Sequence, residues 1–166
     1  MANLKDEIRQ QRPFQSVHEQ ALLNLIRTAD CVQRSVEKAI RPFGVTSTQY
    51  NALRILRGAH PQGLTCSQIG DRMVAAAPDI TRLVARLKKL RLVLQHRDAR
   101  DRRVLWTRIS AAGLRLLHEM DPTIERAPAE VLGHLSAQEL NEFTRLLEKA
   151  RTTSDSGSKP PDCEGK

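Results

Sequence analysis

The basic residues of this chain are concentrated in one segment, which restricts the possible folds more than any other feature. From Arg82 to Arg108 the sequence carries ten Lys and Arg against two Asp, a net charge of +8 that equals the formal net charge of all 166 residues. The rest of the chain is therefore neutral as a whole. A polyanion such as duplex DNA attracts charge concentrated in this way, because neutralised phosphates release counterions. The alternative is a solvated basic face without a partner.

The same segment has the pattern of a helix followed by two strands. Apolar residues recur at helical spacing from Ile80 to Leu90, with the expected inward positions Ile80, Leu83, Val84, Leu87 and Leu90. Strand-like runs begin at Leu92 and end at Ile109, whereas the residues between them, His96 to Arg103, are too polar to be buried. We therefore expect an exposed hairpin tip. A helix followed by such a hairpin is the layout of a winged helix.

Matches to the capping-box pattern predict three further helix starts. They begin at Thr46, Thr65 and Ser136, and in each the first hydroxyl and the fourth side chain can satisfy backbone N–H groups reciprocally. Apolar stripes near helical spacing follow each match. A long helix from about Ser16 to Ile40 precedes them, and the run Arg41-Pro42-Phe43-Gly44 should stop it.

The basic helix has a short helix before it. A helix from Thr65 to Met73, a turn from Val74 to Ala77 and the basic helix together form a helix-turn-helix. We expect Pro78 to open the basic helix, with Asp79 complementing the positive end of its dipole. The second helix of such a unit enters the major groove, with its N-terminal half facing base edges.

Composition and length further restrict the class of protein to which this chain can belong. A hydrophobic content of 40% with one Trp, one Tyr and three Phe predicts an aliphatic core, which suits helix packing. The length of 166 residues fits one domain with an extension, and excludes two large domains. No run approaches the roughly 18 apolar residues that span a bilayer, and no apolar leader is present. We therefore expect a soluble, cytoplasmic protein that does not contact membranes.

The sequence shows no catalytic or metal-binding constellation. The five histidines are scattered without two at one-turn spacing on a helix, and phosphate-binding glycine loops and nucleophile motifs are absent. We expect no enzyme activity, no cofactor and no metal. Cys66 follows a predicted helix N-cap, where a thiol can be activated, and is the redox candidate. Cys31 fits a small core or interface residue, and Cys163 lies in a tail whose composition predicts disorder.

Taken together, these residues resemble one family of transcription regulators. Four elements of the MarR family, TRLVDRLE, GLV, DxRDxR and LTxxG, are matched in order and spacing by residues 81–87, Leu92-Val93, residues 98–103 and residues 109–113. The resemblance covers roughly Arg12 to Arg151. It implies a mainly α fold with a small β wing, a winged helix-turn-helix with an N- and C-terminal helical dimerisation region.

The resemblance also implies a division of the chain. Residues 1–44 would form an N-terminal arm and the first dimerisation helix, and residues 45–110 the winged helix-turn-helix DNA-binding domain. Residues 111–151 would form the C-terminal dimerisation helices, and residues 152–166 a disordered tail.

Residues that meet DNA follow from the resemblance position by position. The expected contacts are Ser67 and Gln68 before the turn, Asp79, Thr81, Arg82 and Arg86 on the recognition helix, and Arg100 and Arg102 in the wing. The expected wing scaffold is Asp98, Asp101 and Arg103, with Asp101 and Arg103 as an internal ion pair. In the plainer alternative, the two Asp only pair with Arg100 and Arg103 to stiffen the turn.

The function that the resemblance implies is control of transcription. We expect a homodimer that binds double-stranded DNA at a pseudo-palindromic operator, with half-sites about one helical turn apart. A small, often phenolic, effector would release this repressor by binding between the dimer helices and the winged helix, where Arg54, His60 and Trp106 are candidate neighbours. Two alternatives remain: a thiol-based redox response through Cys66, and a non-specific DNA-coating protein, suggested by the pI near 10.0.

The recognition helix departs from the family pattern at three positions. Arg91 stands where the family commonly has glycine, so the helix must end either with strain or in a different way. Ala85 and Lys88 replace residues that are frequently acidic in the family. We therefore expect raised non-specific DNA affinity.

Overall fold

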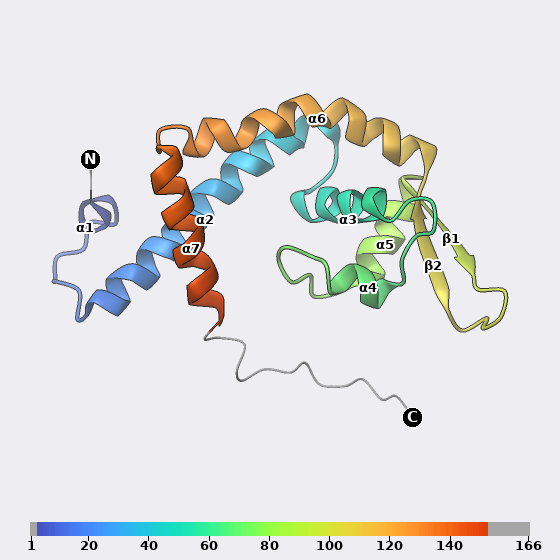
Figure 1. The fold of residues 1–166 in the computed structure, drawn as a ribbon, viewed down its shortest axis with the longest axis horizontal. Coiled ribbons are helices and arrows are strands. Elements are labelled where there is room, and N and C mark those ends of the chain that lie inside the picture. Colours follow the sequence, from blue (N-terminus) through green and yellow to red (C-terminus); the bar gives the residue numbers. More distant parts are fainter. Residues whose placement is uncertain (1–2, 153–166) are drawn as a thin grey trace. The chain divides into compact units, whose positions relative to one another are not determined.

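A computed structural model describes residues 3–152 as a series of helices with one two-stranded hairpin (Figure 1). The elements are α1 (Leu4–Glu7), α2 (Val17–Ile40), η1 (Arg41–Phe43), α3 (Ser47–Gly58), α4 (Cys66–Gly70), α5 (Ile80–Lys89), β1 (Val93–Arg97), β2 (Leu105–Ile109), α6 (Ala111–Leu132) and α7 (Ala137–Thr152). Two compact units are present, one ending at Ala127 and the other beginning at Pro128. The mainly α fold with a small β wing is therefore confirmed.

A cluster of aliphatic side chains forms the core of the first unit. Its fully buried members include Leu53 and Leu56 of α3, Ile69 of α4, Leu87 of α5 and Leu117 and Met120 of α6. Burying each such side chain contributes about 1.5–3 kcal/mol. Because α4, α5 and the start of the wing share this core, their exposed faces are held in fixed relative positions.

The local signals for helix starts are borne out. The side chains of Thr46 and Gln49 cap α3 reciprocally, and those of Thr65 and Gln68 cap α4 in the same way. Before α7, the Ser136 N–H donates to a Glu139 carboxylate oxygen at 2.8 Å, and the Glu139 N–H donates to the Ser136 hydroxyl at 3.3 Å. The long helix α2 begins after Ser16, whose hydroxyl accepts the Glu19 N–H.

The boundaries of the helix-turn-helix differ from the prediction. α4 ends at Gly70, and residues 71–73 continue as a turn in which the Met73 N–H donates to the Gly70 carbonyl. α5 begins only at Ile80, because the Asp79 carboxylate accepts the Arg82 N–H at 2.8 Å and so makes Asp79 the N-cap. Pro78 therefore precedes the cap and does not open the helix.

α5 has one buried face and one exposed face. Leu83, Val84 and Leu87 are buried and Ile80 is half-buried, as predicted. The prediction of an inward Leu90 is wrong, since its side chain is 49% exposed. The physical reason is that the helix ends at Lys89, and Leu90 already belongs to the cap.

Arg91 completes this helix end in the left-handed conformation, with φ of 60°. The Arg91 N–H donates to the Lys88 carbonyl at 2.9 Å, and the Leu92 N–H donates to the Leu87 carbonyl at 3.0 Å. These are the two bonds of a Schellman motif, whose left-handed position is usually glycine. The helix therefore ends in the usual geometry, but with a strained arginine.

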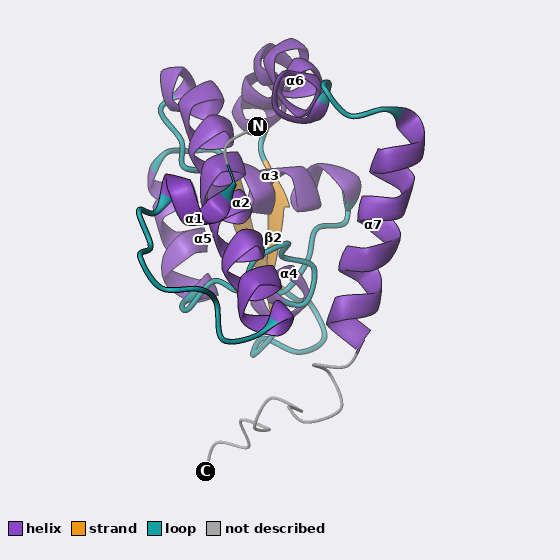
Figure 2. Cartoon of the chain, turned by 90° about the vertical axis from the view of Figure 1, so that its left-hand side faces the viewer, coloured by secondary structure: helices purple, strands orange, loops and turns teal. Residues whose placement is uncertain are grey.

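The two strands, orange in Figure 2, form an antiparallel hairpin. Their register pairs Val93 with Ile109 and Arg97 with Leu105. β1 runs to Arg97, further than predicted, so the tip comprises residues 98–104. Two backbone bonds of 2.8 Å between Leu64 and Thr107 fasten β2 to the segment after α3. The base of the wing is therefore fixed, while its tip extends away from α4 and α5 (Figure 1).

The helices at the two ends of the described chain carry uncovered apolar side chains. On α2, Leu22 and Ile26 are each 57% exposed and Leu25 is 43% exposed. On α7, Leu146 is exposed, and Phe143 is half-buried. None of the helices within residues 3–152 is long and apolar enough to cross a membrane. The predicted tail began at residue 152, but Thr152 is the last residue of α7. Residues 153–166 of that tail, with Cys163, lie outside the described residues.

Candidate nucleic-acid interface

The exposed face of α5 carries the predicted recognition residues. Thr81, Arg82 and Arg86 are all exposed, on the side opposite the buried Leu83 and Leu87. Arg82 and Arg86 are four residues apart and so are neighbours on one face of the helix. Asp79 is also exposed, but its carboxylate is engaged as the N-cap. Its position fixes where the basic face begins.

α5 also borders a groove that the sequence did not reveal. The groove has a volume of about 450 Å³ and is lined by Arg82 and Arg86, by Thr46 and Ser47 at the start of α3, and by Glu37 of α2. The two arginines thus stand beside hydroxyl groups from a segment more than thirty residues earlier. Only tertiary packing brings these residues together.

Ser67 and Gln68 lie at the exposed end of α4. The Gln68 side-chain oxygen accepts the Thr65 N–H at 3.0 Å, as the fourth residue of the capping box. On the inner side of this short helix, Ile69 is buried in the core. The core therefore holds α4 against α5, and it leaves Ser67 and Gln68 facing solvent beside the basic helix.

Asp98 organises the tip of the wing through both of its carboxylate oxygens. Oδ1 accepts the backbone N–H of Arg100 at 2.8 Å and that of Asp101 at 3.1 Å, while Oδ2 accepts the indole N–H of Trp106 at 3.0 Å. The bonds from Asp101, Trp106 and Arg100 hold the pKa of the Asp98 carboxyl below its ordinary value. Asp98 therefore holds the backbone of Arg100, whereas the plainer alternative paired it with the guanidinium.

The predicted ion pair between Asp101 and Arg103 is present. One Asp101 oxygen accepts the Arg103 backbone N–H at 2.9 Å and its side-chain Nε–H at 3.4 Å. The Arg103 side chain is 94% exposed, so the charge interaction itself stabilises little. Arg100 and Arg102 are also exposed, and the Arg102 carbonyl accepts a bond from the Arg97 guanidinium. The tip thus presents arginines from an ordered backbone.

A mostly apolar cavity of about 350 Å³ lies between α2, α3 and the turn after α4. Val36, Tyr50 and Met73 contribute apolar surface, and Arg54 contributes a positive charge. Burial raises the pKa of the Tyr50 hydroxyl more than the neighbouring Arg54 and Arg57 lower it. Of the three candidate neighbours of an effector, Arg54 lines this cavity, whereas His60 and Trp106 do not.

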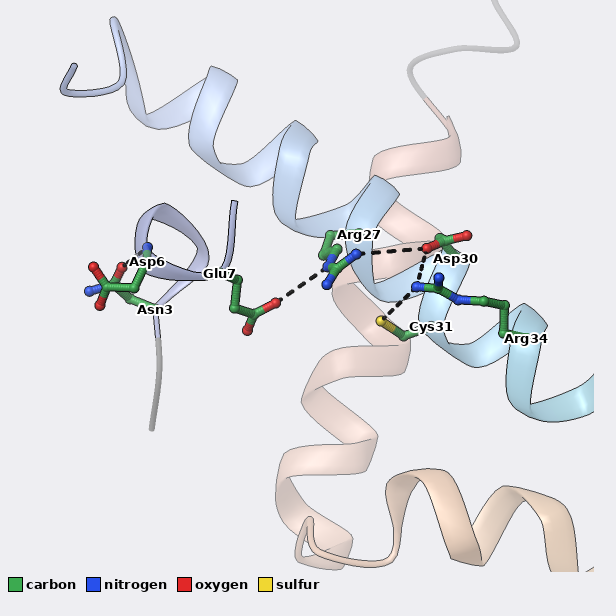
Figure 3. Close-up of polar contacts among 7 residues, drawn as sticks. All are labelled: Asn3, Asp6, Glu7, Arg27, Asp30, Cys31 and Arg34. Carbon is green, nitrogen blue, oxygen red and sulfur yellow. Dashed lines mark hydrogen bonds and ion pairs between the residues drawn. The ribbon is translucent and has the colours of Figure 1, made fainter. Parts of the chain in front are cut away.

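The two described cysteines differ in environment. Cys66 is half-buried at the first position of α4, and packs against the edge of the core. Cys31 is exposed on α2, with its sulfur 3.8 Å from the Arg34 guanidinium (Figure 3). The prediction of a core position for Cys31 is wrong within a single chain, because α2 leaves that side uncovered; the interface alternative stays a prediction.

Charged side chains around Cys31 connect two helices. Arg34 and Arg27 both reach the Asp30 carboxylate, and Arg27 also contacts Glu7 of α1 at 3.3 Å (Figure 3). This network fastens the short helix α1 to α2. Within residues 3–152, no three His, Cys, Asp or Glu side chains lie close enough together to hold a metal ion.

Comparison with known proteins identifies the family. A model described as MarR family matches residues 43–104. The crystal structure of a MarR transcription factor from Planctomyces limnophilus is 41% identical, with 82% of this chain and 98% of that chain covered and a TM-score of 0.64. The PcaV regulator from Streptomyces coelicolor, solved with its natural ligand, is 27% identical, with 76% and 91% covered and a TM-score of 0.65.

Curated relatives agree with the structural ones. The transcriptional regulator MhqR of Bacillus subtilis is 28% identical over 125 residues, which cover 75% of this chain and 85% of the relative. Other curated relatives are named as repressors. The chain belongs to the MarR family of winged helix-turn-helix transcription regulators.

Proposed function

We propose that this chain is a sequence-specific regulator that binds double-stranded DNA as a homodimer. The observation that carries the proposal is the shared core of α5 and the base of the wing, which holds the exposed basic face of α5 in a fixed position beside a hairpin with a basic tip. A helix fits the major groove, where Arg82 and Arg86 can reach base edges or phosphates. Arg100, at the exposed tip of the wing, can enter the minor groove, where negative potential is concentrated.

The remaining predicted contacts support the register on DNA. Ser67, Gln68 and Thr81 are exposed beside the basic face and can donate to phosphates. Arg102 adds a positive charge near the wing tip. Contacts of this kind position a protein on the duplex, whereas base contacts supply the sequence preference.

The exposed apolar side chains of α2 support the homodimer. Leu22, Leu25 and Ile26 lie on neighbouring turns of one helix face, and clustered apolar surface of this kind marks an interaction site. The terminal helical segments, residues 1–44 and 111–151, would form the dimerisation region. Two-fold symmetry of the dimer then requires a pseudo-palindromic operator.

We also propose that a small aromatic acid releases this repressor from its operator in the cytoplasm. The cavity of about 350 Å³ suits one such molecule, with Val36 and Met73 against its ring and Arg54 near its carboxylate. α2 belongs to the proposed dimer region and α3 to the DNA-binding domain. A ligand between them would therefore favour one spacing of the two recognition helices.

Selection of binding sites from a random duplex pool, followed by titration of variants, tests the DNA proposal. Arg82→Ala should cost about 1–3 kcal/mol and alter the preference at one position per half-site. Arg100→Ala should weaken binding. It should also lower the salt slope, which is the slope of the logarithm of affinity against the logarithm of salt concentration, by about one for each wing. Lys149→Ala, at an exposed position of α7 outside the DNA-binding domain, removes the same charge; with its dimer shown to be intact by sedimentation, it should change neither property.

Each outcome has a definite meaning. A loss for Arg82→Ala that is equal across all sequences would assign that residue to a phosphate. An unchanged salt slope for Arg100→Ala would exclude its contact with DNA. For the effector, Arg54→Ala should abolish the thermal stabilisation that benzoate-type acids produce in the wild type. Equal stabilisation of the wild type and Arg54→Ala would show that the cavity is not the effector site.

A further inference from the structure

Trp106, the only tryptophan in the sequence, connects strand β2 to the tip of the wing. Its indole N–H donates to one oxygen of the Asp98 carboxylate, while the other oxygen accepts the backbone N–H groups of Arg100 and Asp101. One carboxylate therefore joins a donor from a strand to two donors from the tip. The indole bond is the only one of the three that reaches outside the tip.

The position of Trp106 in the hairpin makes this bond specific. Trp106 pairs with His96 across the hairpin, and its neighbour Thr107 is fully buried. Because successive residues of a strand face opposite sides, the Trp106 side chain lies on the outer face of the wing. Core packing therefore does not account for a large aromatic residue here. What the Trp106 side chain does contact is Asp98, to which it donates a hydrogen bond.

The strand can serve as a fixed support for the tip. The backbone N–H and carbonyl of Thr107 are both bonded to Leu64, and the rest of β2 is held by its pairing with β1. At the tip, the Asp98 N–H donates to the Val104 carbonyl at 3.0 Å, which closes the loop. Arg100, whose backbone N–H is held by Asp98, projects from this loop into solvent.

We propose that Trp106 is a positioning residue for DNA binding, which acts by holding Asp98 and, through it, the backbone that presents Arg100. The proposal rests on the proposed function, in which Arg100 meets DNA. A tip that is ordered before binding loses less conformational entropy in the complex. The bond from a neutral indole to a charged carboxylate is also of the stronger, charge-assisted kind.

Three substitutions separate this role from others. Trp106→Phe keeps an aromatic ring and removes the donor. Asp98→Asn can keep the acceptor for the two backbone N–H groups but then turns an amide N–H₂ towards the indole. Each should weaken binding to the selected operator about tenfold, the scale of one hydrogen bond to a charged group. Leu94→Ala, on the same outer face but away from the tip, should leave affinity unchanged.

A double-mutant cycle with Arg100→Ala identifies the route of the effect. If Trp106 acts through Arg100, adding Trp106→Phe to Arg100→Ala should cause no further loss of affinity, and Trp106→Phe alone should lower the salt slope towards that of Arg100→Ala. A full tenfold loss in the Arg100→Ala background, or an unchanged slope, would overturn the proposal. A general loss of stability would not change the salt slope.

Fluorescence of the free protein tests the contact without DNA. Asp98→Asn should shift the emission of Trp106 and increase its quenching by acrylamide, whereas Arg100→Ala should leave both as in the wild type. Unchanged emission in Asp98→Asn would show that the bond does not form, even if Trp106→Phe failed to fold. If the wild type selected no DNA site, the proposed function would fail while this measurement would still report on the wing.

Discussion

Replacing Arg91 by glycine should make the protein more stable. Arg91 has a φ of 60°, and a left-handed conformation costs a residue with a Cβ about 1–2 kcal/mol. Glycine removes that cost, but the greater freedom of glycine in the unfolded chain returns about 0.5–1 kcal/mol. The bonds at this helix end are backbone bonds, and the Arg91 carbonyl also accepts the Ser110 hydroxyl at 2.8 Å. We therefore expect a net gain of about 0.5–1 kcal/mol in the free energy of unfolding.

Arg91→Ala is the matched control, because it removes the charge and the long side chain but keeps the Cβ. Urea unfolding should be followed at one protein concentration, since dimerisation would make stability depend on concentration. The glycine variant should be more stable than the alanine variant, with a midpoint of thermal unfolding higher by about 1–4 °C. Equal stability of the two would refute the assignment of strain to Arg91. Both should bind DNA alike, because they lose the same charge.

Three other perturbations test the packing and the wing. In Gly113→Ala the new Cβ would lie 2.7 Å from Ile109 Cγ1 and would clash with the Leu92 carbonyl, which should lower the free energy of unfolding in urea by about 1–3 kcal/mol. Gly58→Ala is the control, because open space surrounds the new Cβ there, and it should leave the free energy of unfolding unchanged. Equal effects of the two substitutions would contradict the packing around Gly113. A double-mutant cycle on Arg57 and Asp121, which form a half-buried pair at 2.8 Å, should give about 0.5–1 kcal/mol, and a coupling of zero would show that the pair does not tie α3 to α6. Folding lowers the pKa of Asp98, so the ionised carboxylate stabilises the wing at every pH above the ordinary pKa of Asp, and this stabilisation is lost only as the pH falls through the lowered pKa. Trp106 emission should therefore change below about pH 3.9. A change centred above that pH, or one that persists in Asp98→Asn, would contradict the assignment.

The sequence predicts those parts of the fold that depend on near neighbours. The capping boxes at Thr46, Thr65 and Ser136 each involve residues three apart, so the four-residue pattern contains the whole interaction. The same holds for the apolar face of α5, except at Leu90. There the periodic pattern continued beyond the helix, because the chain leaves the helix through the left-handed Arg91.

Features that depend on packing could not be predicted. The bond from Trp106 to Asp98 requires the register of the hairpin, and β1 proved longer than the sequence pattern indicated. The cavity that includes Val36, Tyr50 and Met73 joins three separate segments, and no spacing along the chain signals it. By contrast, the ion pair of Asp101 with Arg103 spans two residues and was foreseen through the family resemblance.

The claim that α5 and the wing recognise a specific DNA sequence is tested most directly by comparing affinities. Duplexes selected by the purified protein from a random pool should share a pseudo-palindrome with half-sites about 10 base pairs apart. At physiological salt, the protein should bind the selected duplex about a thousandfold or more tightly than bulk genomic DNA. Equal affinity for both would contradict specific recognition and would instead support a DNA-coating protein that uses its charge alone.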